Sequence, residues 1–281
     1  MIMKNKMPNF VCTALLPSLA VLLLGVQSAQ AGASVYVGSP SAGPSVSMDK
    51  IDHSGWDRIL KKYVNTDGMV DYQGLKASSV DIQGLNSYLQ QLSTAHSQVQ
   101  ATKEGTLAFW INAYNAVTVH GILREYPTTS IRNHTAKVLR YNIWKDLKLY
   151  VGGQPYSLEQ IEHEILRKMG EPRIHFAIVC ASIGCPRLLN EAYVANRLND
   201  QLEVNSRDFF SRSRNFRYDQ SSNVFHMSAI LKWFPEDFGA NQAAQLRTIA
   251  GWLPNDAAKN AALSNSVSVR SLEYDWALNR Q

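Results

Sequence analysis

Five residues in the middle of the chain are of types that could perform nucleophilic chemistry. Cys180 and Cys185 lie in the stretch IHFAIVCASIGCPRL, which also contains His175. Glu162 and His163 are neighbours in the stretch IEHEIL. A deprotonated cysteine is a strong nucleophile, a histidine can take its proton, and a carboxylate can orient that histidine. This combination predicts thiol-dependent acyl transfer or hydrolysis of an amide or an ester.

Three interpretations of the cysteine pair stay open at this point. A disulfide between Cys180 and Cys185 would close a short loop, and it suits an oxidising compartment. Alternatively, Cys185 is a nucleophile with His175 or His163 as its base. In the third interpretation the thiols are buried as small apolar side chains. Two thiolates and a histidine could also bind zinc, but the C-x4-C spacing is a weak metal signal, and we expect no metal and no cofactor.

The N-terminus indicates the compartment in which these thiols reside. Its opening stretch MIMKNKMPNF carries two lysines and no acid, and the leucine-rich run VCTALLPSLAVLLLGV follows. Shortly after that run comes the small-x-small sequence AQA, which is typical of a cleavage site. The pattern predicts that residues 1–31 are a cleaved export signal. The mature protein would then be periplasmic or secreted, have no stable membrane insertion, and lack Cys12.

The composition argues against nucleic acid as a partner. The formal net charge of +5 falls to +3 when the two lysines of the signal are removed. The densest basic stretch, RDFFSRSRNFR, is typical of a solvated face. A hydrophobic fraction of 45%, with six tryptophans and twelve tyrosines, is that of a packed globular protein. We expect a small-molecule or peptide-like ligand, and the sequence leaves the oligomeric state open.

The elements around these residues predict an α+β fold. Residues 32–46 are rich in glycine, serine and proline, and are predicted to be a flexible lead to a single domain at residues 47–281. The stretches LKLYVGGQPYSL and NFRYDQSSNVFHM predict two hairpins, and SVSVRSLEYDW is expected to return to the same sheet. NTDGMVDY does not fit a calcium loop and predicts a tight turn into a short strand. The expected architecture is one mostly antiparallel sheet packed against helices.

The stretch TLAFWINAYNAVTVHGILREYP predicts a buried helix, because it is apolar around nearly its whole circumference. Asn112 and Asn115 are three residues apart and therefore share one face of this helix. A buried amide needs hydrogen-bond partners. The two asparagines would either tie loops to the core or orient a substrate or a catalytic group.

The stretch SLEQIEHEILRKMGEP predicts a second helix, with Ser157 and Gln160 as a capping box. Glu162 lies at the edge of its apolar stripe, whereas His163 points away from that stripe. Two explanations fit a carboxylate in this position. It either forms a salt bridge with a nearby base such as Arg173, or it is an acid or an orienter of histidine in a cleft.

The apolar residues from Ile174 to Cys180 have the length and branching of a buried central strand. In such a strand, successive side chains alternate between the two faces, which places His175 and Cys180 on opposite faces. A turn at SIGCP follows, and NEAYVANRLNDQLEVNSRDFF then has apolar residues at helical spacing. Cys185 would thus lie between a strand end and a helix, where backbone N–H groups and the positive helix end favour a thiolate.

The stretch HMSAILKWFPEDFG predicts a single short helix that Ser228 caps and that ends at Pro235. Trp233, Phe234 and Phe238 are expected to form an aromatic plug in the core. On this interpretation the stretch contributes packing rather than chemistry.

Four blocks of the sequence together resemble the domain-of-unknown-function family 547. They are AFWINAYNAVTVHGIL, IEHEILRKMGEPRIHFAIVCASIGCPRL, SAILKWFPEDFG and LEYDWALN, in the family's order, and the resemblance runs from about Trp56 to the C-terminus. The family is named for lacking an established activity; its members occur as exported bacterial proteins and as plant and animal proteins, some joined to other modules. The resemblance implies that the matching positions form one site. These positions are Asn112, Tyr114, Asn115, Glu162, His163, Arg173, His175, Cys180, Cys185 and Pro186.

The leading functional hypothesis is a thiol-dependent enzyme similar in logic to papain-like and transglutaminase-like enzymes. Cys185 attacks the substrate, His175 or His163 takes the proton, and Glu162 or Asn115 orients that histidine. Those enzymes usually place the cysteine before the histidine, whereas both candidate histidines come first here. The order of such residues differs between folds.

A non-catalytic ligand-binding module is the rival hypothesis. In such a module Cys180 and Cys185 form a structural disulfide, which stabilises the fold and performs no chemistry. An anionic or amide ligand would be held by Asn112, Asn115, Arg173 and His175.

Overall fold

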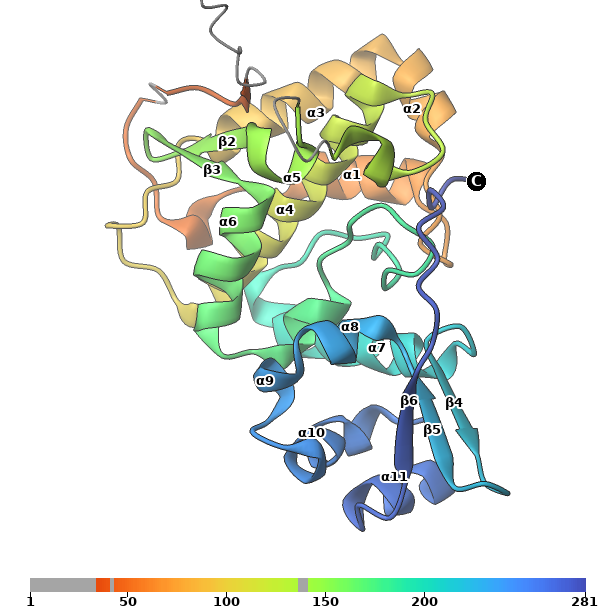
Figure 1. Ribbon diagram of the computed structural model, residues 1–281. Coiled ribbons are helices and arrows are strands. Elements are labelled where there is room, and N and C mark those ends of the chain that lie inside the picture. The colour runs from red at the N-terminus through yellow and green to blue at the C-terminus, as the bar shows by residue number, and fades with distance from the viewer. Residues whose placement is uncertain (1–33, 41–42, 136–140) are drawn as a thin grey trace, which may run out of the picture. The chain divides into compact units, whose positions relative to one another are not determined.

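Two separate three-stranded sheets provide the β-structure of this computed structural model, which describes residues 34–40, 43–135 and 141–281. Each sheet contains one antiparallel and one parallel pair of strands. The α+β class is confirmed, whereas two mixed sheets replace the single, mostly antiparallel one (Figure 1). The strands are β1 (Val35–Val37), β2 (Leu147–Val151), β3 (Gln154–Ser157), β4 (Phe216–Asp219), β5 (Val224–Met227) and β6 (Ser268–Ser271).

Both predicted hairpins form. Gly152 and Gly153 join β2 to β3, and their φ angles of 57° and 77° are ones that glycine adopts without strain. β4 pairs with β5, and β6 returns beside β5, but in the parallel direction. Val35–Val37 lies in the segment predicted to be a flexible lead, yet it forms β1 beside β2. Its two valines and one tyrosine are residues that favour a strand wherever a partner strand is available.

The buried helix predicted around the two asparagines is α4, which extends from Lys103 to Glu125. Thr102 caps it by accepting a hydrogen bond from the Gly105 N–H at 3.0 Å. Most of its side chains lie in the larger of two hydrophobic clusters, together with side chains of the neighbouring helices. These are α1 (Ser54–Tyr63), α2 (Tyr72–Ala77), α3 (Ser79–Leu92) and α5 (Ile143–Asp146), with 3-10 turns at Met48–Lys50 and Ile131–His134.

The second predicted helix forms with its capping box, but only its first turn is α-helical. Its segments are α6 (Leu158–Gln160), a π-helical segment (Ile161–Leu166) and a 3-10 turn (Arg167–Met169). Gly170 then ends the helix with a φ of 66°. A π-helix turns through a smaller angle per residue than an α-helix, so the faces assigned at α-helical spacing shift. His163, predicted to point away from the apolar stripe, therefore lines the same cavity as Glu162.

The buried strand predicted before Cys180 does not form. Its first half belongs to a 3-10 helix (Pro172–Phe176), and the remainder has no regular structure. Asn115 replaces a neighbouring strand as hydrogen-bond partner, because its side chain bonds to the Ala177 C=O and to the Val179 N–H, both at 2.9 Å. An apolar, branched run indicates burial, but it does not distinguish a strand from an irregular segment that side chains satisfy.

The helix after the cysteines starts later than predicted. A 3-10 turn at Ala195–Arg197 leads into α7, which extends from Leu198 to Ser211. Cys185 does not directly precede this helix, so the helix end that was expected to favour a thiolate is not adjacent to it in the chain. Other groups must stabilise the thiolate.

The smaller hydrophobic cluster surrounds β4 and β5. The short helix predicted after Ser228 forms as α8, which Ser228 caps and which ends at Trp233, and a second short helix, α9, starts at Pro235, where a proline is favoured. Phe238 is buried as predicted, whereas Trp233 is 43% exposed and does not belong to the core. The helices of this region are α8 (Ala229–Trp233), α9 (Pro235–Phe238), α10 (Gln242–Ile249) and α11 (Asp256–Leu263), with a 3-10 turn at Ala250–Trp252.

The described residues within 31–281 form one compact unit. In this part of the chain no helix is both long and apolar enough to cross a membrane. The predicted export signal at residues 1–31 lies outside the described residues.

Candidate active site

One cavity brings the predicted catalytic residues together. Cys185, His175, Glu162 and His163 all line it, and Cys180 does so as well. Its volume is about 240 Å³, which is smaller than the pockets that enclose drug-sized ligands, so it suits one small group of a substrate. Aromatic residues form much of the remaining wall; they are Tyr114, Trp144, Trp233, Phe234, Tyr274 and Trp276.

The C-terminal segment holds the loop that carries Cys185. The N–H groups of Ile183 and Gly184 donate to backbone carbonyls in residues 275–277, both at 2.8 Å. A Cβ atom at Gly184 would lie 3.0 Å from the backbone of that segment, so this close approach favours glycine. The pairing brings the hydroxyl of Tyr274 to the thiol.

The Cys185 sulfur accepts three hydrogen bonds. The donors are the Cys180 N–H at 3.0 Å, the Tyr274 hydroxyl at 3.1 Å and the Ser182 hydroxyl at 3.5 Å. Cys185 is only 4% exposed, and burial alone would raise the pKa of its thiol. Hydrogen bonds from these three residues outweigh burial and lower the pKa of Cys185 to about 6. At neutral pH the Cys185 sulfur is therefore largely a thiolate.

Cys180 is the protonated partner of this thiolate. The hydrogen bond with Cys185 and burial both raise the pKa of the Cys180 thiol well above its ordinary value. Both cysteines are free, so the structure holds the reduced pair rather than the disulfide that was one of the three interpretations.

His175 pairs with an aspartate. Its Nε2 lies 2.7 Å from Asp237 Oδ2, and its ring stacks on Phe234 with the centroids 4.5 Å apart. Burial alone would raise the pKa of Asp237, but hydrogen bonds from Arg167 and His175 lower it, so the ionised carboxylate accepts and Nε2 carries the proton. Burial lowers the pKa of His175, and Asp237 opposes this only in part. The ring is thus neutral at pH 7, and its Nδ1 has a lone pair that can take a proton.

His163 is less suited to act as the base. It lies at an exposed position, and its Nδ1 is 3.2 Å from a terminal nitrogen of Arg167. A guanidinium group only donates hydrogen bonds, so Nδ1 of His163 is the acceptor and its lone pair is already engaged.

Glu162 is a carboxyl group without an ion pair among the residues that the structure describes. The predicted salt bridge with Arg173 does not form, because Arg173 pairs with Glu171 at 2.8 Å instead. Glu162 accepts a hydrogen bond from the Tyr114 hydroxyl at 3.2 Å. Burial raises the pKa of Glu162, with His163 and Tyr114 opposing this in part. Glu162 consequently holds a proton to higher pH than an ordinary glutamate, as a general acid must.

The thiolate and the histidines are not hydrogen-bonded to each other. Within the described part of the chain, the partners of Cys185 are hydroxyl, thiol and backbone groups, whereas His175 bonds to Asp237. Hydrogen-bond donors therefore stabilise the sulfur without a neighbouring imidazolium. This differs from the predicted arrangement, in which a histidine takes the proton of the cysteine directly.

Three residues predicted to bind a ligand do not line the cavity. Asn112 bonds to the backbone of Tyr193, donating to its C=O at 2.7 Å and accepting from its N–H at 3.0 Å. Asn115 bonds to the backbone before Cys180 in the same way. Arg173 is engaged by its ion pair. The asparagines thus tie loops to the core, which was one of their two predicted roles.

Asp237 and Tyr274 contact the reactive side chains, although no role was predicted for either of them. Asp237 lies in the block SAILKWFPEDFG and Tyr274 in the block LEYDWALN. Both blocks carry the family resemblance, and that was the available signal. The aromatic residues of both blocks predicted core packing, and no function was therefore assigned to the polar residues between them.

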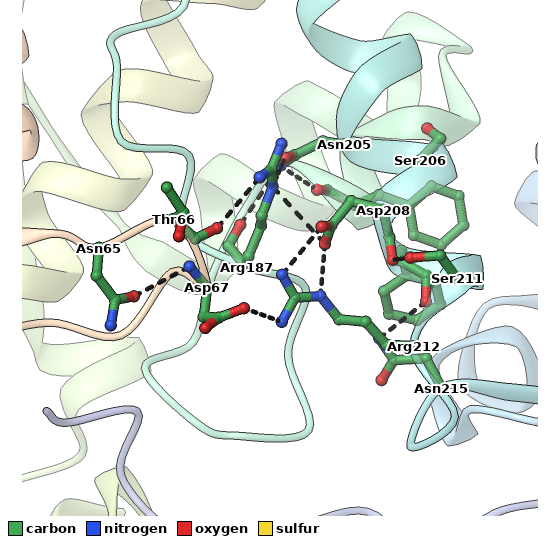
Figure 2. A network of polar contacts seen from close by, with 12 residues as sticks. Asn65, Thr66, Asp67, Arg187, Asn205, Ser206, Asp208, Ser211, Arg212 and Asn215 are labelled. Atoms are coloured by element: carbon green, nitrogen blue, oxygen red, sulfur yellow. Dashed lines mark hydrogen bonds and ion pairs between the residues drawn. The ribbon is translucent and has the colours of Figure 1, made fainter.

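A polar network anchors the chain directly after the cysteine loop (Figure 2). Arg187 donates to Asn205 Oδ1 at 2.8 Å and to the Thr66 C=O at 3.2 Å. Figure 2 also shows Asp208 between two guanidinium groups, at 3.6 Å from Arg187 and 2.7 Å from Arg212. These bonds fix the position of the loop relative to α7.

The tight turn predicted at NTDGMVDY belongs to the same anchor. Gly68 has a φ of 79°, and a Cβ atom there would lie 2.4 Å from the Cβ atom of Arg187. Only glycine permits this approach and this backbone conformation. The short strand expected after the turn is reduced to one residue, Val70, which forms isolated bridges with Val64 and with Arg280.

Three of the six tryptophans of the chain line the cavity. Trp233 stacks on Trp276 with the centroids 5.8 Å apart, and Tyr274 lies 4.5 Å from Trp276. Trp144 packs edge-to-face with Trp276, with the ring centroids 6.3 Å apart. Such a wall favours a flat, apolar group on the substrate.

The described residues contain no group of three or more histidine, cysteine, aspartate or glutamate side chains placed to hold a metal ion. They do combine three functions needed for covalent catalysis. Cys185 supplies a nucleophile, the neutral His175 can accept a proton, and Glu162 can deliver one.

Residues 99–210 match the model of a family described as protein of unknown function, DUF547. This match confirms the resemblance found in the sequence. The matched range includes Glu162, His175 and both cysteines, whereas Asp237 and Tyr274 come after it. No curated protein and no solved structure matches the chain.

Proposed function

We propose that this chain, which carries a DUF547 region at residues 99–210, is a thiol-dependent hydrolase or acyl transferase that acts on an ester or an amide. The observation that carries the proposal is the place of Cys185. Its sulfur accepts three hydrogen bonds and lies in a small apolar cavity that a neutral His175 and a protonatable Glu162 also line. A buried cysteine with a purely structural role would not need donors aimed at its sulfur.

The proposed reaction has two steps. The thiolate of Cys185 attacks the carbonyl carbon, a carbon–sulfur bond forms, and the leaving oxygen or nitrogen departs with a proton from Glu162. His175 Nδ1 then takes a proton from a water or an acceptor alcohol, whose oxygen attacks the thioester. Cys185 leaves as a thiolate, and solvent returns the proton from His175 to Glu162. No base is needed to activate the thiol, because Cys185 is already largely ionised at neutral pH.

We also propose that the protein is exported, with residues 1–31 removed. This proposal is supported by the lysines, apolar run and AQA sequence of the N-terminus. Export bears on the active site, because an oxidising compartment would favour a disulfide between the two cysteines. Processing and thiol state are therefore tested together.

The test is the intact mass of the exported protein, taken before and after iodoacetamide at a series of pH values and without reductant. We expect a chain that starts at Gly32 and a Cys185 that is alkylated half-maximally near pH 6, whereas an ordinary thiol needs about pH 8.5. Cys185→Ser is the matched control and should lose this label, while Cys180 reacts only at higher pH. A chain two hydrogens light that takes no label would contradict the enzyme proposal and favour the binding module with a Cys180–Cys185 disulfide.

The role of Glu162 predicts a change in the pH profile. The wild type should gain activity as Cys185 ionises near pH 6, and since burial raises the pKa of Glu162, the loss of activity that follows its deprotonation should occur at a higher pH than for an ordinary glutamate. Glu162→Gln should lower kcat by about 100-fold and abolish the loss at high pH, leaving the rise near pH 6 in place.

Glu164→Gln is the matched control for this measurement, since Glu164 is an exposed carboxylate of the same helical segment and does not line the cavity. It should retain the profile of the wild type with a phenyl ester as substrate. A loss of activity at high pH that persists in Glu162→Gln would exclude Glu162 as the acid.

A further inference from the structure

The second sheet has an edge without a strand partner among the described residues. Its order is β4-β5-β6, so β6 has β5 on one side only (Figure 1). The N–H groups of Ser268 and Leu272 donate to the β5 side, to Asn223 and Met227. Because the direction alternates along a strand, Val269 and Ser271 direct their N–H and C=O groups away from β5.

A side chain already occupies the position of a strand partner at the start of this edge. Gln242 of α10 donates from Nε2 to the Val267 C=O at 3.3 Å. Val267 lies an even number of positions before Val269 and Ser271, so its backbone groups point to the same side. The bond to Gln242 therefore confirms which side of β6 faces away from β5. Beyond it, no described side chain or backbone group bonds to the outward groups of Val269.

A groove of about 430 Å³ lies along this open edge. One wall is β6, and the opposite wall comes from α8, α9 and α10. Its apolar lining consists of Met227, Leu231, Phe238, Leu246, Ile249 and Val269. A strand edge beside an apolar groove is the geometry by which a sheet takes up an extended peptide, since the backbone provides hydrogen bonds and the groove holds alternate side chains.

The charges at the groove are all of one sign. Lys232 and Arg270 line it, no acidic residue does, and neither cation forms an ion pair within the described part of the chain. Both side chains are exposed, so they are available to a carboxylate of a ligand. A membrane or a small anion would meet the same two charges, but neither would use the row of backbone groups on β6.

We propose that this groove binds an extended peptide segment that carries acidic residues, which adds to the sheet as a strand beside β6. The site is separate from the catalytic cavity and does not depend on the function proposed for it. α8 lies between the two, because Ile230 and Trp233 line the cavity whereas Leu231 and Lys232 line the groove. A bound peptide would therefore lie one helix away from Cys185.

The test selects a phage-displayed library of random seven-residue peptides on the full chain. The most enriched peptide is then synthesised with a fluorescein label, and its affinity is measured by fluorescence anisotropy. We expect enriched peptides to contain branched apolar residues and at least one aspartate or glutamate. Val269→Pro removes one outward N–H at an edge position that tolerates proline, and should weaken binding at least tenfold. Val269→Thr, which keeps that N–H and the branched shape, should weaken it less than threefold.

Charge reversal provides a second, independent set of variants, which decides the question if Val269→Pro does not fold. The double variant Lys232→Glu, Arg270→Glu should weaken binding at least tenfold, whereas Arg247→Glu, an exposed charge of α10 outside the groove, should not. The proposal is overturned if no peptide is enriched over the uncoated support, or if the enriched peptide binds all variants equally. It is also overturned if the chain dimerises in analytical ultracentrifugation and Val269→Pro abolishes the dimer, because the edge then belongs to a second copy.

Discussion

Replacing Cys185 with serine is expected to lower kcat/KM for a phenyl ester by at least about 10,000-fold while the protein stays folded. The expectation follows from the mechanism, in which the sulfur forms the bond to the substrate. A serine hydroxyl at this position would remain protonated, because the donors that stabilise a thiolate with a pKa near 6 cannot ionise an alcohol. The measurement is the release of nitrophenol from nitrophenyl acetate and nitrophenyl benzoate, with the midpoint of thermal unfolding recorded for each variant.

Cys180→Ser is the matched control. Its hydroxyl can still donate to Cys185, and its backbone N–H, which donates to the Cys185 sulfur at 3.0 Å, is unchanged. This variant should keep activity within about tenfold of the wild type. Equal, complete loss in both variants with a fall in thermal stability would indicate a structural role for the pair. Full activity in Cys185→Ser would remove Cys185 from the mechanism.

The parts of the fold that could be predicted are those in which neighbours in the chain decide the outcome. The capping box at Ser157 lies within four consecutive residues, and the turn of the first hairpin is set by Gly152 and Gly153. The buried helix α4 is similar, because its apolar character extends over all its faces and requires burial wherever the helix lies. In each case, residues close together in the sequence determine the local structure.

The candidate site could be predicted only in part, because its decisive contacts join distant segments. His175 and Asp237 are 62 positions apart, and Tyr274 and Cys185 are 89 apart. No periodicity connects such pairs. The segment before Cys180 shows the same limit, since it resembles a strand in composition but owes its conformation to Asn115, 64 positions before Val179.

Because the site is assembled from distant segments, the groups that stabilise the Cys185 thiolate differ from the predicted ones. The sequence suggested nearby backbone N–H groups and the positive end of a helix as the source of stabilisation. The structure contains one backbone donor, the Cys180 N–H, and the hydroxyl groups of Tyr274 and Ser182 take the place of the helix end. Because burial lowers the pKa of His175, the ring is unprotonated at neutral pH and can serve as a base for the second step.

Replacing Asn115 with leucine is expected to lower the free energy of unfolding by about 2 to 6 kcal/mol. Leucine has a similar size, but it leaves the Ala177 C=O and the Val179 N–H without partners in the core, and each unsatisfied buried group costs about 1 to 3 kcal/mol. Both groups lie just before Cys180, so the loop that carries Cys185 should be displaced as well. Chemical denaturation measures the first effect, and the pH at which Cys185 is alkylated reports the second.

Thr118→Val is the matched control, since Thr118 lies on the same helix and its buried hydroxyl has no hydrogen-bond partner among the described residues. Removing that hydroxyl should leave stability unchanged or increase it slightly, because no bond is lost. The comparison separates the two roles that the sequence allowed for the asparagines. If the stability of Asn115→Leu remained within about 0.5 kcal/mol of the wild type yet activity was lost, Asn115 would act on the substrate or on a catalytic group. If Asn115→Leu loses stability and Thr118→Val does not, Asn115 holds the cysteine loop against the core.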